Sequence, residues 1–307
     1  GNFDDVTILS LEKSLIKVEK VIPAAPISLE GGVVTVALTI KGDDLVVEIP
    51  DDAQAWLTAG EPAALGNLPT VELTATANEG GARTTTVTFK TTSEGKEYVA
   101  MADIEQLGAI AEVSVADFLA AEVGTALFKL TGVVKNVKSD VYGNFDLVDA
   151  TGSVYVYGLT ATQVSSNDKS FGSLGIKEGD VVTIIGTRAE YKGTAQVGGP
   201  AYYVSHVGTT ESTVADFLAQ PTGSDWYKLT GTVTNIASDV YGNFDLVDET
   251  GSVYVYGLTA APVAKNDKSF ASLGLVEGDK IVIVGTRAEY KGTAQVGGPA
   301  YFIKKAE

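Results

Sequence analysis

The sequence predicts an all-β protein, in which a β-sandwich is followed by two tandem five-stranded barrels, each preceded by a short helix. Three observations lead to this fold class. Residues 114–205 align with residues 213–304 at a constant offset of 99 without a gap, and 65 of the 92 aligned pairs are identical. Within each copy, short segments alternate apolar and polar side chains with the period of two that a half-buried strand requires. The N-terminal third carries β-branched runs separated by glycine turns, which is typical of a sandwich.

The repeat defines the domains. An insertion-free repeat of this length is too long for a solenoid unit and indicates a whole domain that was copied. We therefore expect three domains, at residues 1–112, 113–206 and 207–307, with a linker at 207–212 between the copies. Two blocks are almost unchanged between the copies. Residues 139–161 match 238–260 except that Glu249 replaces Ala150, and residues 186–202 are identical to 285–301.

In the N-terminal domain we expect a pair of strands at 33–40 and 45–49. A second pair is expected at 70–77 and 84–90, joined across Asn78-Glu79-Gly80-Gly81. Residues 98–107 would close the sheet. Residues 59–69 contain two prolines and little periodicity, which predicts a loop.

The same domain resembles a known family. A Gly-Gly pair before the first strand, Trp56 after an acidic turn, the segment 78–83 and the closing Gln106-Leu107-Gly108 are similar to a BACON domain, over about residues 10–110. That family is an immunoglobulin-like module of secreted Bacteroidetes proteins, often joined to carbohydrate-active modules. The resemblance implies a sandwich fold and an extracellular setting, and it departs from the family pattern at 59–69.

Each copy predicts a short helix, five strands and a helical turn. The helix is expected at 114–120, where Ser114, or Thr213 in the second copy, can cap its first turn. In the first copy the strands are expected at 128–137, 143–148, 153–157, 181–189 and 194–204, with the helical turn at 169–174. Five strands with a helical piece between the third and fourth is the order of an OB-fold.

The residues of both copies also resemble that fold family. Lys129-Leu130-Thr131-Gly132, the segments 142–149 and 151–157, and Glu178-Gly179-Asp180 are similar to OB-fold domains of secreted bacterial proteins. The family is named for nucleic-acid binding, so the resemblance implies a barrel and offers a nucleic acid as one class of ligand.

Composition excludes several kinds of chemistry. The chain has no Cys and a single His, His206, which excludes disulfides, thiolate nucleophiles, Cys- or His-cluster metal sites and a Ser-His-Asp triad. Asp146 and Asp149 would flank opposite faces of a strand, which argues against a carboxylate-pair hydrolase. We therefore predict no catalytic residue, no metal and no cofactor, and a protein that is not an enzyme.

Charge limits the partners. The formal net charge is −17. The first copy has nine acidic and seven basic residues and the second has ten and seven, so their net charges are −2 and −3. Proteins that bind nucleic acid gain much of their affinity from neutralising phosphates, so no duplex nucleic acid is expected. No apolar run is long enough to span a bilayer. We expect the protein to be a monomer.

OB-folds bind ligands on the outer face of strands 2 and 3 and on the flanking loops. Alternation sends Val154 and Val156 inward and Tyr155 and Tyr157 outward. The candidate ligand-binding residues are Tyr142, Asn144, Asp146, Tyr155, Tyr157 and Tyr191 in the first copy, and Tyr241, Asn243, Asp245, Tyr254, Tyr256 and Tyr290 in the second. Flat aromatic rings beside amides and carboxylates suit sugars. The alternative is that these tyrosines are β-formers that only cover the sheet.

The sequence thus favours a non-catalytic extracellular or cell-surface protein that binds glycans or mediates adhesion. One alternative is an OB-fold protein that binds single-stranded nucleic acid by stacking bases on the same rings. A structural spacer or protein-interaction module is the other. The chain begins at Gly1-Asn2-Phe3, and we expect that a signal or lipidation segment has been removed before it.

Overall fold

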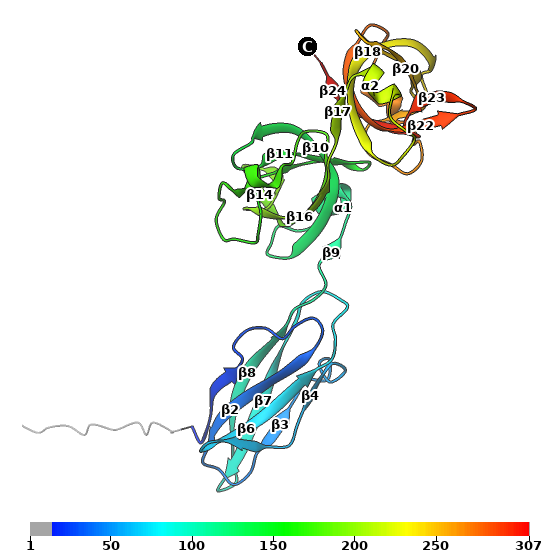
Figure 1. Ribbon diagram of the computed structural model, residues 1–307. Helices are drawn as coiled ribbons and strands as arrows, with labels where there is room; N and C mark the ends of the chain where they lie inside the picture. Colours follow the sequence, from blue (N-terminus) through cyan, green and yellow to red (C-terminus); the bar gives the residue numbers. More distant parts are fainter. Residues whose placement is uncertain (1–13, 307) are drawn as a thin grey trace, which may run out of the picture. The chain divides into compact units, whose positions relative to one another are not determined.

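The computed structural model describes residues 14–306 and is built almost entirely of β-strands, as predicted (Figure 1). Its contacts divide the chain into two compact units, residues 1–110 and 111–307. The division lies close to the boundary predicted between residues 112 and 113. Residues 1–13 of the predicted first domain lie outside the described residues. Both barrels belong to the second unit, and each has its own sheet and its own core.

The first unit is a sandwich of two sheets around one core. One sheet contains β1 (Ile16–Ile22), β2 (Gly32–Ile40), β6 (Leu68–Ala75) and β4 (Leu57–Ala59) in that order, with β5 (Ala63–Leu65) also paired to β6. The other contains β3 (Val46–Glu48), β7 (Arg83–Ser93) and β8 (Lys96–Gln106). Val36 and Leu73 from the first sheet meet Phe89 and Ile104 from the second in the buried core. Alternation along each strand therefore supplies one apolar face per sheet.

Three predictions for this unit were wrong. The strands expected as a pair at 33–40 and 45–49 do not pair, because β2 joins β1 and β6 while β3 joins β7. The strands expected at 70–77 and 84–90 do not pair, because β6 joins β2 while β7 joins β3 and β8. The chain between them crosses from one sheet to the other. Residues 59–69 are not simply a loop, because β5 forms a hairpin with β6 in which Ala63 lies opposite Thr70. Alternation identifies which face of a strand is apolar but does not identify its partner.

Arg83 contacts two other residues on which the family resemblance of this unit rests, Trp56 and Gln106. The guanidinium of Arg83 lies 4.4 Å from the centre of the Trp56 ring, and its Nε donates to Gln106 Oε1 over 3.0 Å. Gln106 is buried and donates to the carbonyl oxygens of Ser28 and Thr76. These bonds tie the end of β8 to the other sheet, which explains why a buried amide is tolerated there.

Each barrel closes with the strand order of an OB-fold. In the first copy the elements are α1 (Val115–Ala120), β10 (Leu127–Ser139), β11 (Asn144–Asp149), β12 (Gly152–Val156), η1 (Ser170–Leu174), β14 (Val181–Tyr191) and β15 (Thr194–Val197). The sheet runs β10-β11-β12-β15-β14, and β14 pairs again with β10. Only β12 and β15 are parallel within this ring, and the helical turn η1 lies between the third and fourth strands.

The second copy repeats this order. Its elements are α2 (Val214–Leu218), β18 (Trp226–Ser238), β19 (Asn243–Asp248), β20 (Gly251–Val255), η2 (Ser269–Leu273), β22 (Lys280–Tyr290) and β23 (Thr293–Val296). The equivalent core residues Phe145/Phe244 and Val156/Val255 are fully buried in both barrels, which confirms that the copies share one fold. The predicted helix caps are also present, since Ser114 and Thr213 each accept from a backbone N–H of the first turn.

The strand expected at 194–204 is divided in two. β15 ends at Val197, and β16 (Ala201–Val207) pairs instead with the other side of β14 and with β13 (Leu159–Thr160). Gly198-Gly199-Pro200 separates them. Gly198 has φ +85°, and a Cβ there would lie 2.2 Å from the Ala201 nitrogen, so only glycine fits this turn. β21 (Leu258–Thr259) and β24 (Ala300–Lys305) repeat the arrangement.

The predicted linker at 207–212 is not a free connection. β17 (Thr210–Ser212) pairs in parallel with β18, as β9 (Ala111–Glu112) does with β10. The backbone N–H and the hydroxyl of Thr209 both donate to Asp180 Oδ1, over 2.9 and 3.0 Å. The segment is thus anchored to both barrels.

Candidate ligand-binding face

The outer face of each barrel carries a row of polar and aromatic side chains. Asp146 on β11 lies directly opposite Tyr155 on β12, and Gln196 on β15 lies next to Tyr155 in the parallel register. Val154 and Val156 are buried in the core, so the predicted alternation is confirmed. Tyr155 is half-buried, whereas Tyr157 beyond the end of the strand is 50% exposed. In the second copy Asp245 lies opposite Tyr254, and Tyr256 is 54% exposed.

In the first copy, hydrogen bonds hold this face in place. Asn144 Nδ2 donates to the Tyr155 hydroxyl over 2.9 Å, and Asn136 Nδ2 donates to Asp146 Oδ2 over 2.9 Å. The ammonium of Lys138 lies 4.7 Å from the centre of the Tyr155 ring. Tyr155 is therefore engaged on its hydroxyl and on one ring face, which leaves Tyr157 as the more available ring of the pair.

The second copy differs in two contacts. Ala237 stands where the first copy has Lys138, so no charged side chain occupies that position beside Tyr254. Asn243 accepts a hydrogen bond from the Gly257 N–H over 3.1 Å. Asn235 still donates to Asp245 Oδ2 over 2.9 Å, as its counterpart does in the first copy.

A cavity of about 350 Å³ opens at the edge of this face in the second copy, and the predicted residues Asp245 and Tyr254 do not line it. It is lined by three of the predicted residues, Tyr241, Asn243 and Tyr256, together with Gly257, Ala264, Lys265, Asn266, Gly298 and Pro299. Tyr241 is 43% exposed, so both tyrosines of the cavity are accessible to solvent. Asn266 Nδ2 donates to the Tyr241 carbonyl oxygen over 2.8 Å, which fixes the loop against the aromatic side of the cavity.

The loops that complete the cavity were missed from sequence. The loop before η2 contributes Lys265 and Asn266, and the turn after β23 contributes Gly298 and Pro299. A sequence feature that could have pointed to them is the identity of residues 167–171 with 266–270, directly after a stretch in which the copies diverge. In the first copy Asn167 Nδ2 likewise donates to the Tyr142 carbonyl oxygen, over 3.4 Å, so this loop is attached at the equivalent position.

Tyr191 and Tyr290 stand apart from the other candidates. They end β14 and β22 at the tips of the hairpins made with β15 and β23, and the second of these hairpins projects from its barrel in Figure 1. They are 64% and 63% exposed, and each ring lies near the neighbouring Lys192 or Lys291. Tyr290 does not line the cavity that holds Tyr241 and Tyr256. Tyr290 is therefore not brought together with Tyr241 and Tyr256, although all three are candidate ligand-binding residues.

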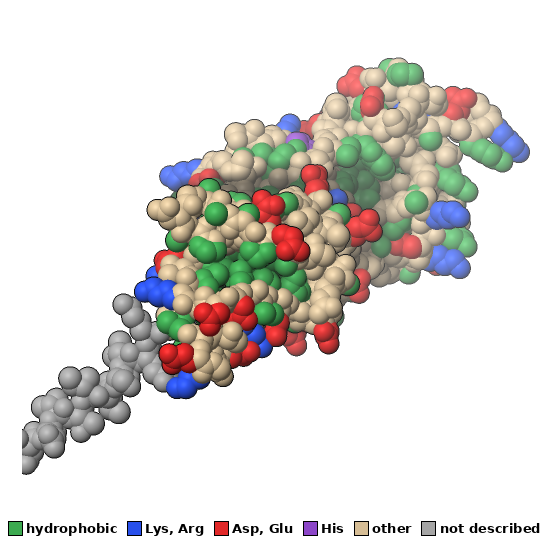
Figure 2. Space-filling view, turned by 90° about the horizontal axis from the view of Figure 1, so that it is seen from below, with side chains coloured by type: hydrophobic (Ala, Val, Ile, Leu, Met, Phe, Trp, Pro, Cys, Tyr) green, Lys and Arg blue, Asp and Glu red, His purple; other side chains and the backbone are tan. Residues whose placement is uncertain are grey.

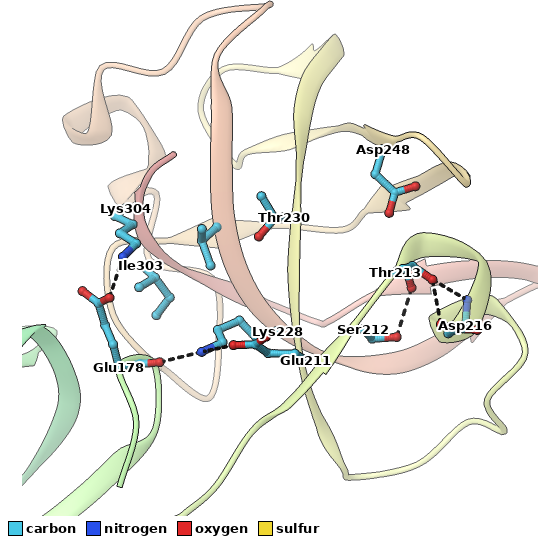
Figure 3. A pocket seen from close by; sticks show the side chains of 11 residues that line it. Glu178, Glu211, Ser212, Thr213, Asp216, Lys228, Thr230, Asp248, Ile303 and Lys304 are labelled. Carbon is cyan, nitrogen blue, oxygen red and sulfur yellow. Dashed lines mark hydrogen bonds and ion pairs between the residues drawn. The ribbon is translucent and has the colours of Figure 1, made fainter. Parts of the chain in front are cut away.

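A larger cavity, of about 590 Å³, lies beside the second barrel (Figure 3). Both of its lysines are paired with glutamates. Lys228 Nζ lies 3.1 Å from Glu211 Oε1, and Lys304 Nζ lies 2.7 Å from Glu178 Oε2. Asp216 accepts from the Thr213 hydroxyl at the start of α2. These groups serve the fold and the contact between the barrels, and the cavity contains none of the predicted residues.

Neither a cluster of metal-ligating side chains nor a membrane-spanning helix is found among the described residues. Between residues 14 and 306, no group of three His, Asp or Glu side chains is arranged to hold a metal ion. Over the same residues no helix has the length and apolar character needed to cross a bilayer. On the face shown in Figure 2, Lys and Arg side chains lie among acidic and uncharged ones and do not form one broad patch.

Comparisons with known proteins do not assign a family. No family model matches the chain, and no curated protein matches it. Among solved structures, InvD of Yersinia pseudotuberculosis is similar with a TM-score of 0.24 and 12% identity, over 95% of this chain and 97% of that one. The endo-fucoidan hydrolase MfFcnA4 of glycoside hydrolase family 107 is similar with a TM-score of 0.21 and 9% identity, over 91% of this chain and 42% of that one. Both TM-scores are too low to bear on fold or function.

Proposed function

We propose that this chain is a non-catalytic extracellular or cell-surface protein whose two barrels bind glycans on their tyrosine faces. The observation that carries the proposal is the cavity lined by Tyr241, Asn243, Tyr256 and Asn266. It combines two partly exposed aromatic rings with two side-chain amides in a volume suited to a sugar unit.

The chemistry of the cavity supports a polar, uncharged ligand. The apolar face of a pyranose ring packs against an aromatic ring, while amide groups can both donate to and accept from hydroxyls. Asn243 and Asn266 are already held by backbone hydrogen bonds. Such prior fixation lowers the entropy lost when a ligand binds. Two such faces on one chain would raise the avidity for a glycan that presents several units.

Single-stranded nucleic acid is the second candidate, and a specific observation favours it. Several of the candidate tyrosines have a lysine ammonium beside the ring: Lys138 at Tyr155, Lys192 at Tyr191, Lys268 at Tyr241 and Lys291 at Tyr290. A ring that stacks a base next to a cation that meets a phosphate is the usual single-strand site. The net charges of −2 and −3 on the copies weigh against it.

A binding survey at two salt concentrations separates these candidates. The intact chain is applied to an array of glycans and to homopolymeric DNA and RNA oligonucleotides, at about 50 mM and 200 mM salt. We expect binding to a subset of glycans that changes little with salt. Oligonucleotide binding that weakens steeply with salt would instead support the second candidate. If nothing binds on either array, the tyrosine faces only cover the sheet and the proposal fails.

A further inference from the structure

The two barrels meet through unlike faces. Val133, Val148 and Val181 of the first copy, here called the front face, pack in one apolar cluster against the second copy. The second copy contributes Trp226, Val282, Val284, Tyr301 and Ile303, here called the back face. Val133 and Val284 are completely buried, and Tyr301 and Ile303 are 2% and 4% exposed. A contact between a front and a back is heterologous, and such contacts extend into chains of modules unless something stops them.

Side chains of both barrels donate hydrogen bonds across this contact. The turn Glu178-Gly179-Asp180 at the edge of the front face accepts from the back face at two backbone oxygens. The buried Tyr301 hydroxyl donates to the Gly179 carbonyl over 2.7 Å, and Lys228 Nζ donates to the Glu178 carbonyl over 3.1 Å. In the opposite direction, Lys135 Nζ donates to the Ala260 carbonyl over 2.9 Å.

The second copy keeps the hydrogen-bonding turn but not the apolar front face. Its turn Glu277-Gly278-Asp279 has the same sequence and is exposed at Glu277 and Gly278. On its front face Val247 is retained, but Thr232 replaces Val133 and Lys280 replaces Val181. Lys280 is exposed, and these three residues line an open cavity of about 620 Å³.

The first copy keeps most of a back face. Tyr202 and Lys129 stand where Tyr301 and Lys228 make their hydrogen bonds, and Leu127, Ile185 and Val204 stand where Trp226, Val284 and Ile303 pack. Val204 is 42% exposed, whereas its buried counterpart Ile303 is 4% exposed. The departures are Thr183 in place of Val282 and Ser205 in place of Lys304.

We propose that Thr232 and Lys280 terminate a head-to-tail stacking interaction that the barrel is otherwise built to repeat. A second chain could stack only by placing the back face of its first copy against the front face of the second copy. This contact would bury the Lys280 ammonium against apolar side chains. Burial of an unpaired charge is costly, so Lys280 disfavours the stacking of a second chain on the front face of the second copy. Repeat proteins end in modules with a polar outer face for the same reason.

A reciprocal exchange of these two residues tests the proposal in the full-length chain. The variant Thr232→Val/Lys280→Val gives the second copy the front face of the first. We expect it to self-associate in sedimentation velocity runs, with a dissociation constant at least about tenfold below any that the natural chain shows. Adding Val204→Lys to this variant places a charge on the back face of the first copy and should abolish the association. The control Lys41→Val/Thr84→Val adds the same two side chains at exposed positions of the first unit.

The opposite exchange, Val133→Thr/Val181→Lys, gives the first copy the polar front. We expect faster amide hydrogen exchange at residues 282–284 and easier proteolysis at 207–212, while circular dichroism keeps its β signature. The proposal is overturned if the valine variant stays monomeric, or if its association resists Val204→Lys. It is equally overturned if the control associates as strongly, or if the natural chain already stacks.

Discussion

Lys135 places its ammonium group in the contact between the two barrels. It donates to the Ala260 carbonyl and lies 5.5 Å from the centre of the Phe302 ring. Burial lowers its pKa to about 8, against a smaller opposing effect of the Glu178 carboxylate. Thr234 occupies the equivalent position in the second copy, where no further barrel covers it. Burial of the Lys135 charge therefore destabilises the contact, while the hydrogen bond from Lys135 to the Ala260 carbonyl stabilises it.

That pKa gives the contact a pH dependence of defined sign. The unfolded lysine, with its ordinary pKa of 10.5, binds a proton more tightly than the folded one. Stability therefore rises as the pH increases from about 8 towards 10.5, because the penalty of the buried charge is removed. We expect the unfolding free energy of the natural chain to rise relative to Lys135→Met over this interval. Urea titrations at pH 7.5 and 10 measure it, and a constant difference between the two proteins would contradict the assignment.

At the scale of elements, each short helix is fixed by one aspartate of the β11–β12 or β19–β20 turn. Asp248 Oδ2 accepts from the Val214 N–H over 2.8 Å, while Oδ1 accepts from Thr250 and Gly251. Burial acts to raise the pKa of Asp248, but these hydrogen bonds outweigh it and hold the pKa below its ordinary value. Asp149 makes the same bonds to Val115 and its own turn.

We expect Asp248→Ala to lower the unfolding free energy at pH 7 by about 1–2 kcal/mol, since helix N-termini lose about this much without their acceptor. The loss should shrink as the pH falls through the depressed pKa of the natural residue, because its charged form supplies the stabilisation. Thermal unfolding at pH 7 and pH 3 measures both effects. A penalty that does not change with pH would show that the charge is unimportant.

Strand positions were predictable from sequence where a local pattern determines them. Residues 143–148 and 153–157 alternate cleanly, and they form β11 and β12 with Phe145 and Val156 inside. Pairings that depend on the rest of the fold were not predictable. The turn at Gly198 divides one apolar run into two strands, and the sheet change after β6 leaves no mark in the alternation. For the same reason the tyrosines of the cavity were found, while the loop of Asn266 was not.

At the scale of the whole molecule, a sandwich unit is followed by a unit in which two barrels share an apolar contact. The repeat supplies an internal control for that contact. Tyr301 is 2% exposed and bonded to Gly179, whereas the identical Tyr202 of the first copy is only half-buried. The same side chain therefore stands once inside the contact and once outside it.

We expect Tyr301→Ala to destabilise the barrel pair by about 3–5 kcal/mol, as for other buried aromatic residues. Tyr202→Ala should cost clearly less, because its ring loses less contact. Chemical denaturation followed by tryptophan fluorescence suits the comparison, since Trp226 lies 5.6 Å from the Tyr301 ring between centroids. Equal costs for the two variants would mean that the contact contributes little to stability.

The central claim is that the cavity around Tyr241 and Tyr256 binds a glycan, and titration calorimetry of matched tyrosine variants tests it most directly. The titrant is the tightest-binding glycan of the array. The double variant Tyr241→Ala/Tyr256→Ala with the equivalent changes Tyr142→Ala/Tyr157→Ala should lose binding by at least about a hundredfold. Thermal stability should change little, because these rings are 41–54% exposed. Tyr191→Ala/Tyr290→Ala, which removes more exposed rings outside the cavity, should bind as the natural chain does. Unchanged affinity in the first variant, or a loss confined to the second, would contradict the account.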